Sequence, residues 1–207
     1  MIVYTRVFYS KMDNQSKKVL IKTDNSCMWI IENFTPDYTD ELVNIKLHET
    51  PEIVIFGKKC KQRRDVCFFS NESDGYKYSG AIAKAEPLVN PLLVNIMEKV
   101  NEKTESNFNG ILVNRYNDGS DYLSAHSDDP RGLSPVSKAV ACVTYGCKRT
   151  FRVRCKYTKK IICDIEPTPG SLLVMEGNFQ SEFTHEIPIR KKISQPRISL
   201  TFRYHII

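Results

Sequence analysis

Three side chains in the sequence have the residue types and the spacing of a metal site. His126 and Asp128 are separated by one residue in a turn-like stretch that follows a β-rich segment. Side chains two residues apart in an extended chain point the same way, so the imidazole and the carboxylate can share one metal ion. His185 follows a second β-rich segment and can close the site from across a barrel. The pattern predicts a centre with two histidines and one carboxylate.

Such a ligand set leaves three coordination positions open for a co-substrate and O2, as non-haem Fe(II) chemistry requires. Each of these residues can also be explained without a metal site. A His-x-Asp triplet also arises by chance, and a lone histidine such as His185 is more often structural than a ligand. The two other histidines, His48 and His205, have no supporting pattern and are expected to play no part in the site.

The last β-rich segment, Arg197–Arg203, strengthens the prediction. Strand periodicity places its residues on two faces. One face is apolar core and consists of Ile198, Leu200 and Phe202; the other consists of Arg197, Ser199, Thr201 and Arg203. Two guanidinium groups on one inward face are costly unless an anion lies between them. A dicarboxylate co-substrate satisfies both arginines through charge-assisted hydrogen bonds. The alternative is a polar face exposed to solvent.

These residues need a scaffold that is mostly β. Asn90-Pro91 and Thr35-Pro36 are typical helix starts, and they predict helices from residue 36 to about 48 and from 91 to about 104. The first 25 or so residues are expected to form a hairpin or a loosely held arm. Beyond residue 109 we expect six short strands, at 110–116, 138–145, 149–157, 161–165, 171–175 and 198–204. Helices followed by many strands predict a sandwich or barrel with helices on one side.

Composition agrees with an ordinary globular protein. The chain has 207 residues, with 41% hydrophobic and 26% charged residues, and no apolar run approaches the ~20 residues of a membrane helix. We expect a single domain over residues 1–207. About 1–108 would be an N-terminal extension with helices and a lid, and about 109–207 the catalytic core. The seven cysteines show no zinc spacing, and reduced structural thiols are expected in a soluble intracellular protein.

Basic residues are concentrated in three clusters. The net charge is +6, and the clusters lie at residues 58–64, 148–160 and 190–192. One cluster alone is usually a solvated face. Three of them in a modest domain favour a nucleic-acid partner.

At this point the sequence resembles the AlkB-type dioxygenases, which depend on 2-oxoglutarate and Fe(II). The resemblance runs from about Thr50 to Tyr204 and is closest to the nucleic-acid repair members. The motifs that carry it are Asn114-Arg115-Tyr116-Asn117-Asp118-Gly119, His126-Ser127-Asp128-Asp129, Pro169 through Gly177, His185-Glu186-Ile187-Pro188 and Pro196-Arg197 through Arg203. It implies a double-stranded β-helix, or jelly roll, with helices buttressing one sheet and a nucleotide-recognition lid.

The resemblance also implies roles for single residues. The Fe(II) ligands would be His126, Asp128 and His185. The residues holding 2-oxoglutarate would be Asn114, Tyr116, Arg197, Thr201 and Arg203, with Arg203 near the carboxylate that chelates iron and Arg197 on the distal one.

On the substrate side, the segment from Arg63 to Gly80 would form the lid. The residues implied there are Arg63, Tyr76, Tyr78 and Ser79, with the two tyrosines available to stack on a flipped base. Asp129 would face the positive charge of a methylated base, and Phe56 would be an aromatic finger inserted into the base stack. The alternative is that Tyr76, Tyr78 and Phe56 are ordinary strand residues.

The function implied is oxidative removal of methyl groups from 1-methyladenine and 3-methylcytosine in DNA, single- or double-stranded, and in RNA as an extension. Formaldehyde and succinate would be released, and Fe(II), 2-oxoglutarate and O2 would be needed. Other possibilities are an RNA-modification demethylase, a protein hydroxylase or demethylase on the same fold, and an inactive binding module. We expect a monomer without membrane association, in the nucleus or the cytoplasm.

Overall fold

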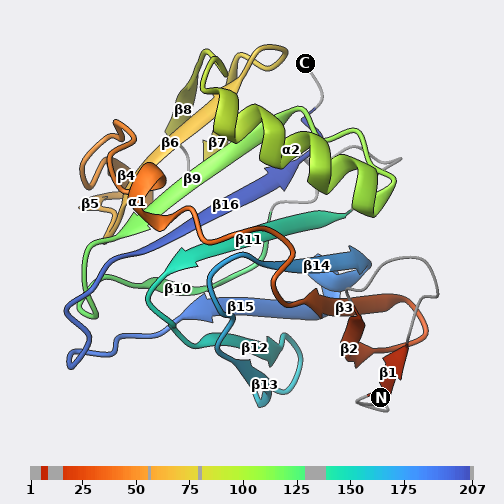
Figure 1. Cartoon of the computed structure of the whole chain (residues 1–207). Helices are drawn as coiled ribbons and strands as arrows, with labels where there is room; N and C mark the ends of the chain where they lie inside the picture. Colours follow the sequence, from red (N-terminus) through yellow and green to blue (C-terminus); the bar gives the residue numbers. More distant parts are fainter. Residues whose placement is uncertain (1–5, 9–15, 56, 79–80, 129–138, 206–207) are drawn as a thin grey trace.

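The computed structural model describes residues 6–8, 16–55, 57–78, 81–128 and 139–205 (Figure 1). The described strands form two main sheets and one separate hairpin. The larger sheet has ten strands in the order β1 (Arg6–Phe8), β2 (Lys17–Lys22), β3 (Ser26–Ile31), β14 (Ser171–Gly177), β11 (Val140–Gly146), β16 (Arg197–Arg203), β9 (Gly110–Tyr116), β6 (Asp65–Ser70), β8 (Ala81–Glu86) and β7 (Gly75–Tyr78).

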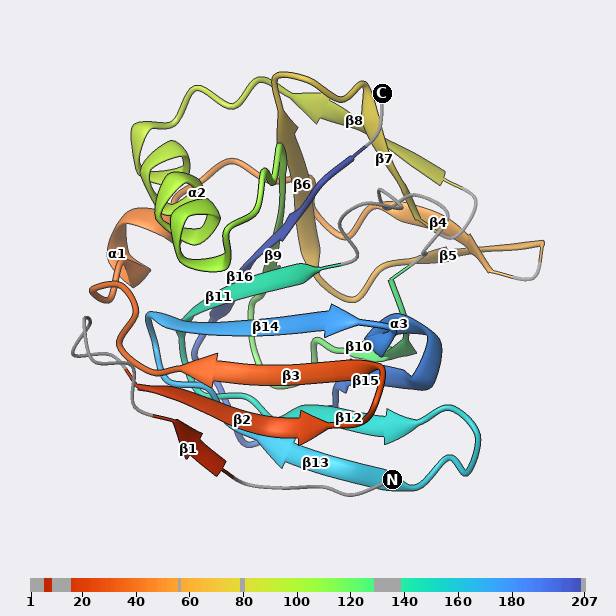
Figure 2. The ribbon, with the colours of Figure 1, turned by 90° about the vertical axis from the view of Figure 1, so that its right-hand side faces the viewer.

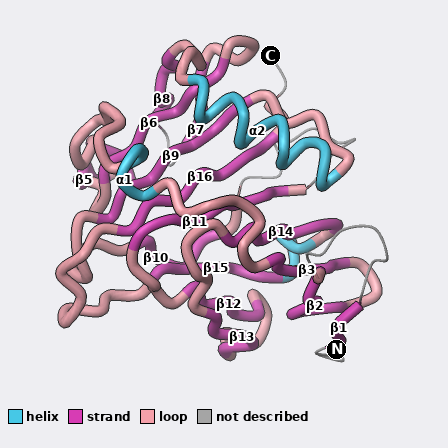
Figure 3. Tube along the Cα trace, in the orientation of Figure 1, coloured by secondary structure: helices cyan, strands magenta, loops and turns pink. Residues whose placement is uncertain are grey.

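A smaller sheet has four strands in the order β10 (Leu123–His126), β15 (Phe183–Ile187), β12 (Phe151–Cys155) and β13 (Ile161–Ile165). A separate hairpin consists of β4 (Glu52–Ile55) and β5 (Lys58–Lys61). The helices are α1 (Thr39–Leu42), α2 (Pro91–Thr104) and α3 (Phe179–Glu182), and Figure 3 shows how small a part of the chain they form.

The six strands expected beyond residue 109 are present, with ends shifted by at most two residues. Two further strands were not expected. These are β10 and β15, which carry His126 and His185 and pair with each other. Strand β10 has only four residues, so its alternation is too brief to be read from the sequence.

The second predicted helix is correct at both ends. Asn90 caps α2, because its side-chain oxygen accepts from the main-chain N–H groups of Leu92 (2.9 Å) and Leu93 (3.3 Å), and Pro91 occupies the first helical position. The apolar side of α2 buries Leu93, Ile96 and Val100.

The first predicted helix is much shorter than expected. Helix α1 has only four residues, Thr39–Leu42, instead of extending to about residue 48. The carbonyls of Val43 and Ile45 accept hydrogen bonds from the guanidinium of Arg115, at 2.9 and 3.3 Å. His48 then bridges to Val66 at the edge of β6. Tertiary contacts therefore replace the hydrogen bonds that would continue the helix.

The described residues of the N-terminal segment agree with the predicted hairpin and not with a loose arm, because β1 pairs antiparallel with β2 at the edge of the larger sheet. Strand β3 pairs with β14 over six residues, from Ile31 opposite Leu172 to Ser26 opposite Gly177. Strand β2 continues the sheet beyond β3, with Lys17 stacked over Trp29.

The larger sheet buries both of its faces. One face packs against α2 through side chains that include Ile198, Leu200 and Phe202. The other face packs toward the smaller sheet, where Leu173 and Met175 meet Phe151 and Val153. Figure 2 shows α1 and α2 on one side of the larger sheet and β12 and β13 on the other. This mostly β jelly roll with helices against one sheet confirms the expected fold class. No helix in the described ranges has the length and apolar character of a membrane span.

Candidate active site

The predicted metal ligands meet between the two short strands. His126 on β10 is the direct register partner of His185 on β15, and their ring centroids are 4.3 Å apart. Asp128 lies two residues beyond His126, with its Oδ1 3.8 Å from His126 Nε2. One ligand atom from each of the three residues lies within 4.8 Å of the others. This spacing suits a single metal ion.

Neighbouring groups hold these ligands in place. His126 Nδ1 is 3.0 Å from the carbonyl of Ser124, and the His185 ring stacks on Phe151 with centroids 5.3 Å apart. The main-chain N–H of Asp128 donates to the side-chain oxygen of Gln180 at 3.0 Å. Such outer contacts orient metal ligands and tune their affinity.

The electrostatics favour the ligating protonation states. Burial lowers the pKa of both His126 and His185, that of His185 to about 3, so both are neutral near pH 7. Burial alone would raise the pKa of Asp128, but Arg203 and the two histidines outweigh it and bring that pKa to about 2. Metal ligation needs neutral imidazoles and an ionised carboxylate.

The donor atoms also fit an ion. Asp128 Oδ1 accepts from Arg203 Nη2 at 2.6 Å, whereas Asp128 Oδ2 and His185 Nδ1 are buried without a hydrogen-bond partner among the described residues. Buried polar atoms of this kind are costly unless something binds them. Two nitrogen donors and one carboxylate are the donor set that Fe(II) takes in oxygenases.

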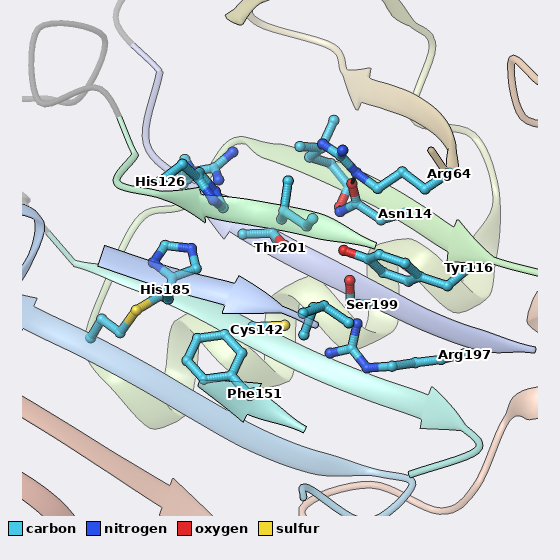
Figure 4. Close-up of a pocket in the computed structure, with 15 residues that line it drawn as sticks. Arg64, Asn114, Tyr116, His126, Cys142, Phe151, His185, Arg197, Ser199 and Thr201 are labelled. Atoms are coloured by element: carbon cyan, nitrogen blue, oxygen red, sulfur yellow. Dashed lines mark hydrogen bonds between the residues drawn. The ribbon is translucent and has the colours of Figure 1, made fainter. Parts of the chain in front are cut away.

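The arginine face of β16 lines a pocket beside these ligands. Alternation places Arg197, Ser199, Thr201 and Arg203 on one side of the strand, as predicted, and this side faces the pocket (Figure 4). Asn114 and Tyr116 join from β9, where they are the register partners of Ser199 and Arg197.

The two arginines of this face have different surroundings. Arg203 is paired with Asp128. Arg197 is only 3% exposed, and its side chain makes no hydrogen bond or ion pair with any described residue. Its guanidinium carbon lies 5.3 Å from the centre of the Tyr116 ring. A buried charge without a counterion is unfavourable, so the Arg197 guanidinium marks a place for an anion.

The pocket contains residues that the sequence reasoning did not assign. Arg64 is buried and donates from Nε to the Asn114 side-chain oxygen at 2.8 Å, whereas the neighbouring Arg63, the one predicted, has an exposed side chain. Cys142 of the pocket was also missed, as was Gln180, which contacts the main chain of Asp128 outside the pocket lining. Strand alternation could have found Cys142. It pairs with Thr201 of β16, and Thr144, two residues further along β11, pairs with Ser199, so both lie on the pocket face of the sheet.

The other predicted substrate residues lie at the limit of what is described. Tyr76 and Tyr78 belong to β7, an edge strand paired with β8, but their side chains lie outside the description. Phe56, Ser79 and Asp129 lie outside the described residues, with Phe56 falling between the described strands β4 and β5.

The basic stretch at residues 148–160 is not one free positive face. Arg152 makes two bonds to Asp164, at 2.8 and 2.7 Å, and Arg154 pairs with Glu186 at 2.9 Å. Lys156 donates to a main-chain carbonyl of α3 at 2.7 Å. The cations of this stretch that are exposed and have no acidic partner in the described part of the chain are Lys148, Lys159 and Lys160.

Arg149 of the same stretch is fully buried. Its guanidinium donates to the carbonyls of Asp118 (2.8 Å), Asp121 (2.7 Å) and Pro188 (3.0 Å). It lies 5.9 Å from the ring of Tyr116. This arginine ties together the two loops that flank the pocket.

Comparison with known proteins agrees with this geometry. Residues 35–203 match the 2OG-Fe(II) oxygenase superfamily. The mouse DNA oxidative demethylase ALKBH2 is 34% identical over 159 residues, which cover 73% of this chain and 66% of the relative. The Arabidopsis thaliana protein of the same name is 29% identical, covering 94% and 71%. The mouse alpha-ketoglutarate-dependent dioxygenase alkB homolog 3 is 34% identical, covering 62% and 47%.

The chain thus spans a little less than two thirds of the mouse ALKBH2 that it matches, and 60% of the human one. Among solved structures, the structure of OsALKBH1 aligns with a TM-score of 0.54 and 16% identity over 90% of this chain and all of that one, which supports the fold. Fe(II), 2-oxoglutarate and O2 are the cofactor and co-substrates of the matched family. The chain therefore belongs to the 2OG-Fe(II) oxygenase superfamily, and its relatives confirm the AlkB-type resemblance.

Proposed function

We propose that the chain is an oxidative dealkylase that removes methyl groups from 1-methyladenine and 3-methylcytosine in DNA, a direct-reversal repair reaction. The observation that carries the reaction type is the position of Arg197. Its buried and uncompensated guanidinium lines the same pocket as His126 and His185, the two histidines of the His-Asp-His cluster. The names of the relatives, DNA oxidative demethylases, support the substrate.

The metal would be held by His126, Asp128 and His185. When bound there, Fe(II) with 2-oxoglutarate and O2 supplies the oxidising power that inserts oxygen into a C–H bond. The protein's own contribution is positioning. Arg203 holds one carboxylate oxygen of Asp128 at 2.6 Å and leaves the other available.

For the co-substrate, Arg197 would take the distal carboxylate of 2-oxoglutarate through a bidentate pair. Asn114, Tyr116 and Thr201 would contact the rest of the molecule, and Arg203 would lie near its metal-binding end. The support is that all five line the same pocket. A guanidinium that gains an anion in a water-poor site gives both affinity and orientation.

For the substrate, the lid would consist of the strand region around Arg63, Tyr76, Tyr78 and Ser79, with Asp129 beside the base. A base must leave the duplex to reach the pocket, and stacking on aromatic rings compensates part of that cost. Phe56 would fill the gap in the stack. The β4–β5 hairpin supports this role through its charge. Its second strand exposes Lys58, Lys59 and Lys61, which can contact phosphates.

We further propose that residues 1–207 form one domain, with about 1–108 as extension and lid and about 109–207 as catalytic core. The pairing of β3 with β14 supports this, since the extension shares a sheet with the core. The protein would act as a monomer inside the cell, in the nucleus or the cytoplasm, where DNA is its partner.

The test uses purified protein with Fe(II), ascorbate and 2-oxoglutarate. Oligonucleotides carrying 1-methyladenine or 3-methylcytosine, in single- and double-stranded DNA, are read by mass spectrometry for loss of the methyl group. We expect methyl loss and succinate formation that both require 2-oxoglutarate. The His126→Ala variant should lose both, whereas His48→Ala, which removes an exposed histidine outside the pocket, should retain them.

Two outcomes would contradict the proposal. Succinate formation without methyl loss from any oligonucleotide would support an oxygenase but contradict methylated DNA as its substrate. If the wild type and His126→Ala behave alike in both readouts, the hypothesis that the chain is an enzyme fails, and a binding module is favoured. RNA versions of the oligonucleotides test the alternative of an RNA demethylase.

A further inference from the structure

Cys142 occupies an unusual place for a structural cysteine. It lies on β11 as the direct register partner of Thr201 on β16. Its strand neighbours Ala141 and Val143 pack on the α2 side of the sheet, so Cys142 faces the opposite side and lines the pocket. Figure 4 shows its sulfur directed into the space that His185 and Arg197 also face. Its exposed fraction is 8%.

The charges around Cys142 favour an anion and not a neutral molecule. Burial raises the pKa of the Cys142 thiol, whereas Arg197, a hydrogen bond with Thr201, and Arg203 lower it. The Asp128 carboxylate, which is paired with Arg203, also raises it, so Arg197 is the uncompensated positive charge beside the sulfur. The second, independent observation is Arg197 itself, which is 97% buried, aimed into the pocket and without a counterion among the described residues. An anionic molecule is therefore attracted to the immediate neighbourhood of the sulfur.

The other cysteines provide a contrast within the same chain. Cys155 is the last residue of β12, and hydrogen bonds from Thr158 lower the pKa of its thiol. Cys67 is buried, and burial raises the pKa of its thiol to about 11. Reagents without charge should therefore react first at Cys155. Of the seven cysteines, Cys142 alone lines the pocket that contains Arg197.

We propose that Cys142 is a covalent attachment site for small anionic electrophiles, in particular α,β-unsaturated dicarboxylates that enter in place of 2-oxoglutarate. This inference rests on the proposed dicarboxylate site. The carboxylate of the reagent pairs with Arg197, and the Cys142 sulfur forms a bond to one alkene carbon. The π pair of the C=C bond takes the thiol proton at the neighbouring carbon, so no electrons are gained or lost. The product is a stable thioether that blocks the pocket.

The geometry explains how a thiol with a raised pKa can still be the favoured site. Binding holds the alkene beside the sulfur, which replaces a bimolecular encounter by a local one. The rate at Cys142 then depends on occupancy of the pocket, whereas the rate at Cys155 depends only on the reagent concentration.

The experiment incubates the full-length protein with fumarate and maps the modified cysteines by peptide mass spectrometry. A second arm compares iodoacetate with neutral iodoacetamide, which are similar in size; in both, sulfur displaces iodide and the thiol proton goes to solvent. We expect fumarate adducts at Cys142. We also expect an iodoacetate-to-iodoacetamide ratio at Cys142 about tenfold above that at Cys155. Excess 2-oxoglutarate should protect Cys142 and leave Cys155 unchanged.

Two variants serve as controls. Cys142→Ser, checked for folding by circular dichroism, should lose the adduct. Arg197→Met keeps the thiol and should lose the preference for the charged reagent. If 2-oxoglutarate binds in a titration but neither anion modifies Cys142 preferentially, the covalent site is wrong and the proposed function stands. If Cys142 shows the preference but 2-oxoglutarate neither binds nor protects, the anion site is right and the proposed co-substrate is wrong.

Discussion

Two buried arginines lie near the ring of Tyr116, and they are used in opposite ways. Arg149, 1% exposed, donates to three main-chain carbonyls and holds two loops together. The side chain of Arg197, which is 3% exposed, has no hydrogen bond or ion pair with a described residue and faces the pocket. The two guanidinium centres are 5.9 and 5.3 Å from the same ring.

The difference separates a structural arginine from a binding one. Three carbonyls accept from Nη1 and Nη2 of Arg149 before any ligand arrives, so most of its desolvation is compensated within the fold, although its Nε has no partner among the described residues. Arg197 remains uncompensated until an anion enters, so the folded protein stores part of the cost and recovers it on binding. Burial alone would have placed both in one class.

The largest expected effect is on 2-oxoglutarate binding and follows from replacing Arg197. Arg197→Met should weaken 2-oxoglutarate binding by about 100-fold to 1,000-fold, because breaking a buried ion pair costs several kcal/mol. Calorimetric titration of the metal-loaded protein measures this. The free energy of unfolding without 2-oxoglutarate should stay equal or rise, since an uncompensated charge is removed. A weakening below tenfold would show that Arg197 is not the anion site.

The same substitution at the other arginine should have the reverse profile. Arg149→Met should lower the free energy of unfolding by about 3 kcal/mol, because buried carbonyls lose their donors. Urea unfolding followed by the fluorescence of Trp29, the one tryptophan of the chain, measures it. We expect 2-oxoglutarate affinity within about tenfold of wild type. The comparison fails if Arg149→Met reduces affinity as much as Arg197→Met.

His205 is a third buried basic side chain, and unlike the two arginines it is neutral in the folded protein near pH 7. Burial, with Arg203, lowers the pKa of His205 to about 4, and its ring packs against Phe68. In the unfolded chain the His205 imidazole binds a proton near pH 6.5, whereas in the folded protein it does so only near pH 4. The free energy of unfolding therefore falls as the pH drops from 6.5 toward 4. His205→Gln should remove about 2 kcal/mol of this loss between pH 6.5 and 5. Urea unfolding of both proteins in chelator tests it, and identical pH slopes would contradict the assignment.

The smallest expected effect concerns a positioning contact. Gln180 is buried and accepts the main-chain N–H of Asp128. Gln180→Leu should weaken metal binding by about tenfold, since outer contacts of metal ligands have this weight. Gln180→Glu keeps the acceptor and should restore part of the affinity. Titration with Mn(II) compares the three proteins, and equal affinities would show that Gln180 only fills space.

Some of this could be predicted from the sequence. Alternation along residues 197–203 separates the core face from the pocket face without knowledge of any neighbour. The cap at Asn90 and the apolar stripe behind it determine α2 locally. The spacing of His126 and Asp128 indicates a shared ligand set, because the two are only two residues apart.

Other features could not be predicted. The neighbours Arg63 and Arg64 look alike in the sequence, yet Arg64 turns into the pocket and bonds to Asn114. The cations of residues 148–160 look like one basic face, but most of them bond to acids or carbonyls that lie far away in the sequence. The helix expected up to residue 48 stops early because Arg115 takes its carbonyls.

The sequence by itself determined which residues can do chemistry and which face of a strand they share, because side-chain direction in a strand follows from the backbone alone. Only the tertiary structure decided what each of them meets. His185 comes opposite His126 through pairing of β10 with β15, and Arg149 and Arg197 acquire opposite roles through their partners. A buried charge takes its role from the groups that compensate it, and those groups are brought to it by long-range folding.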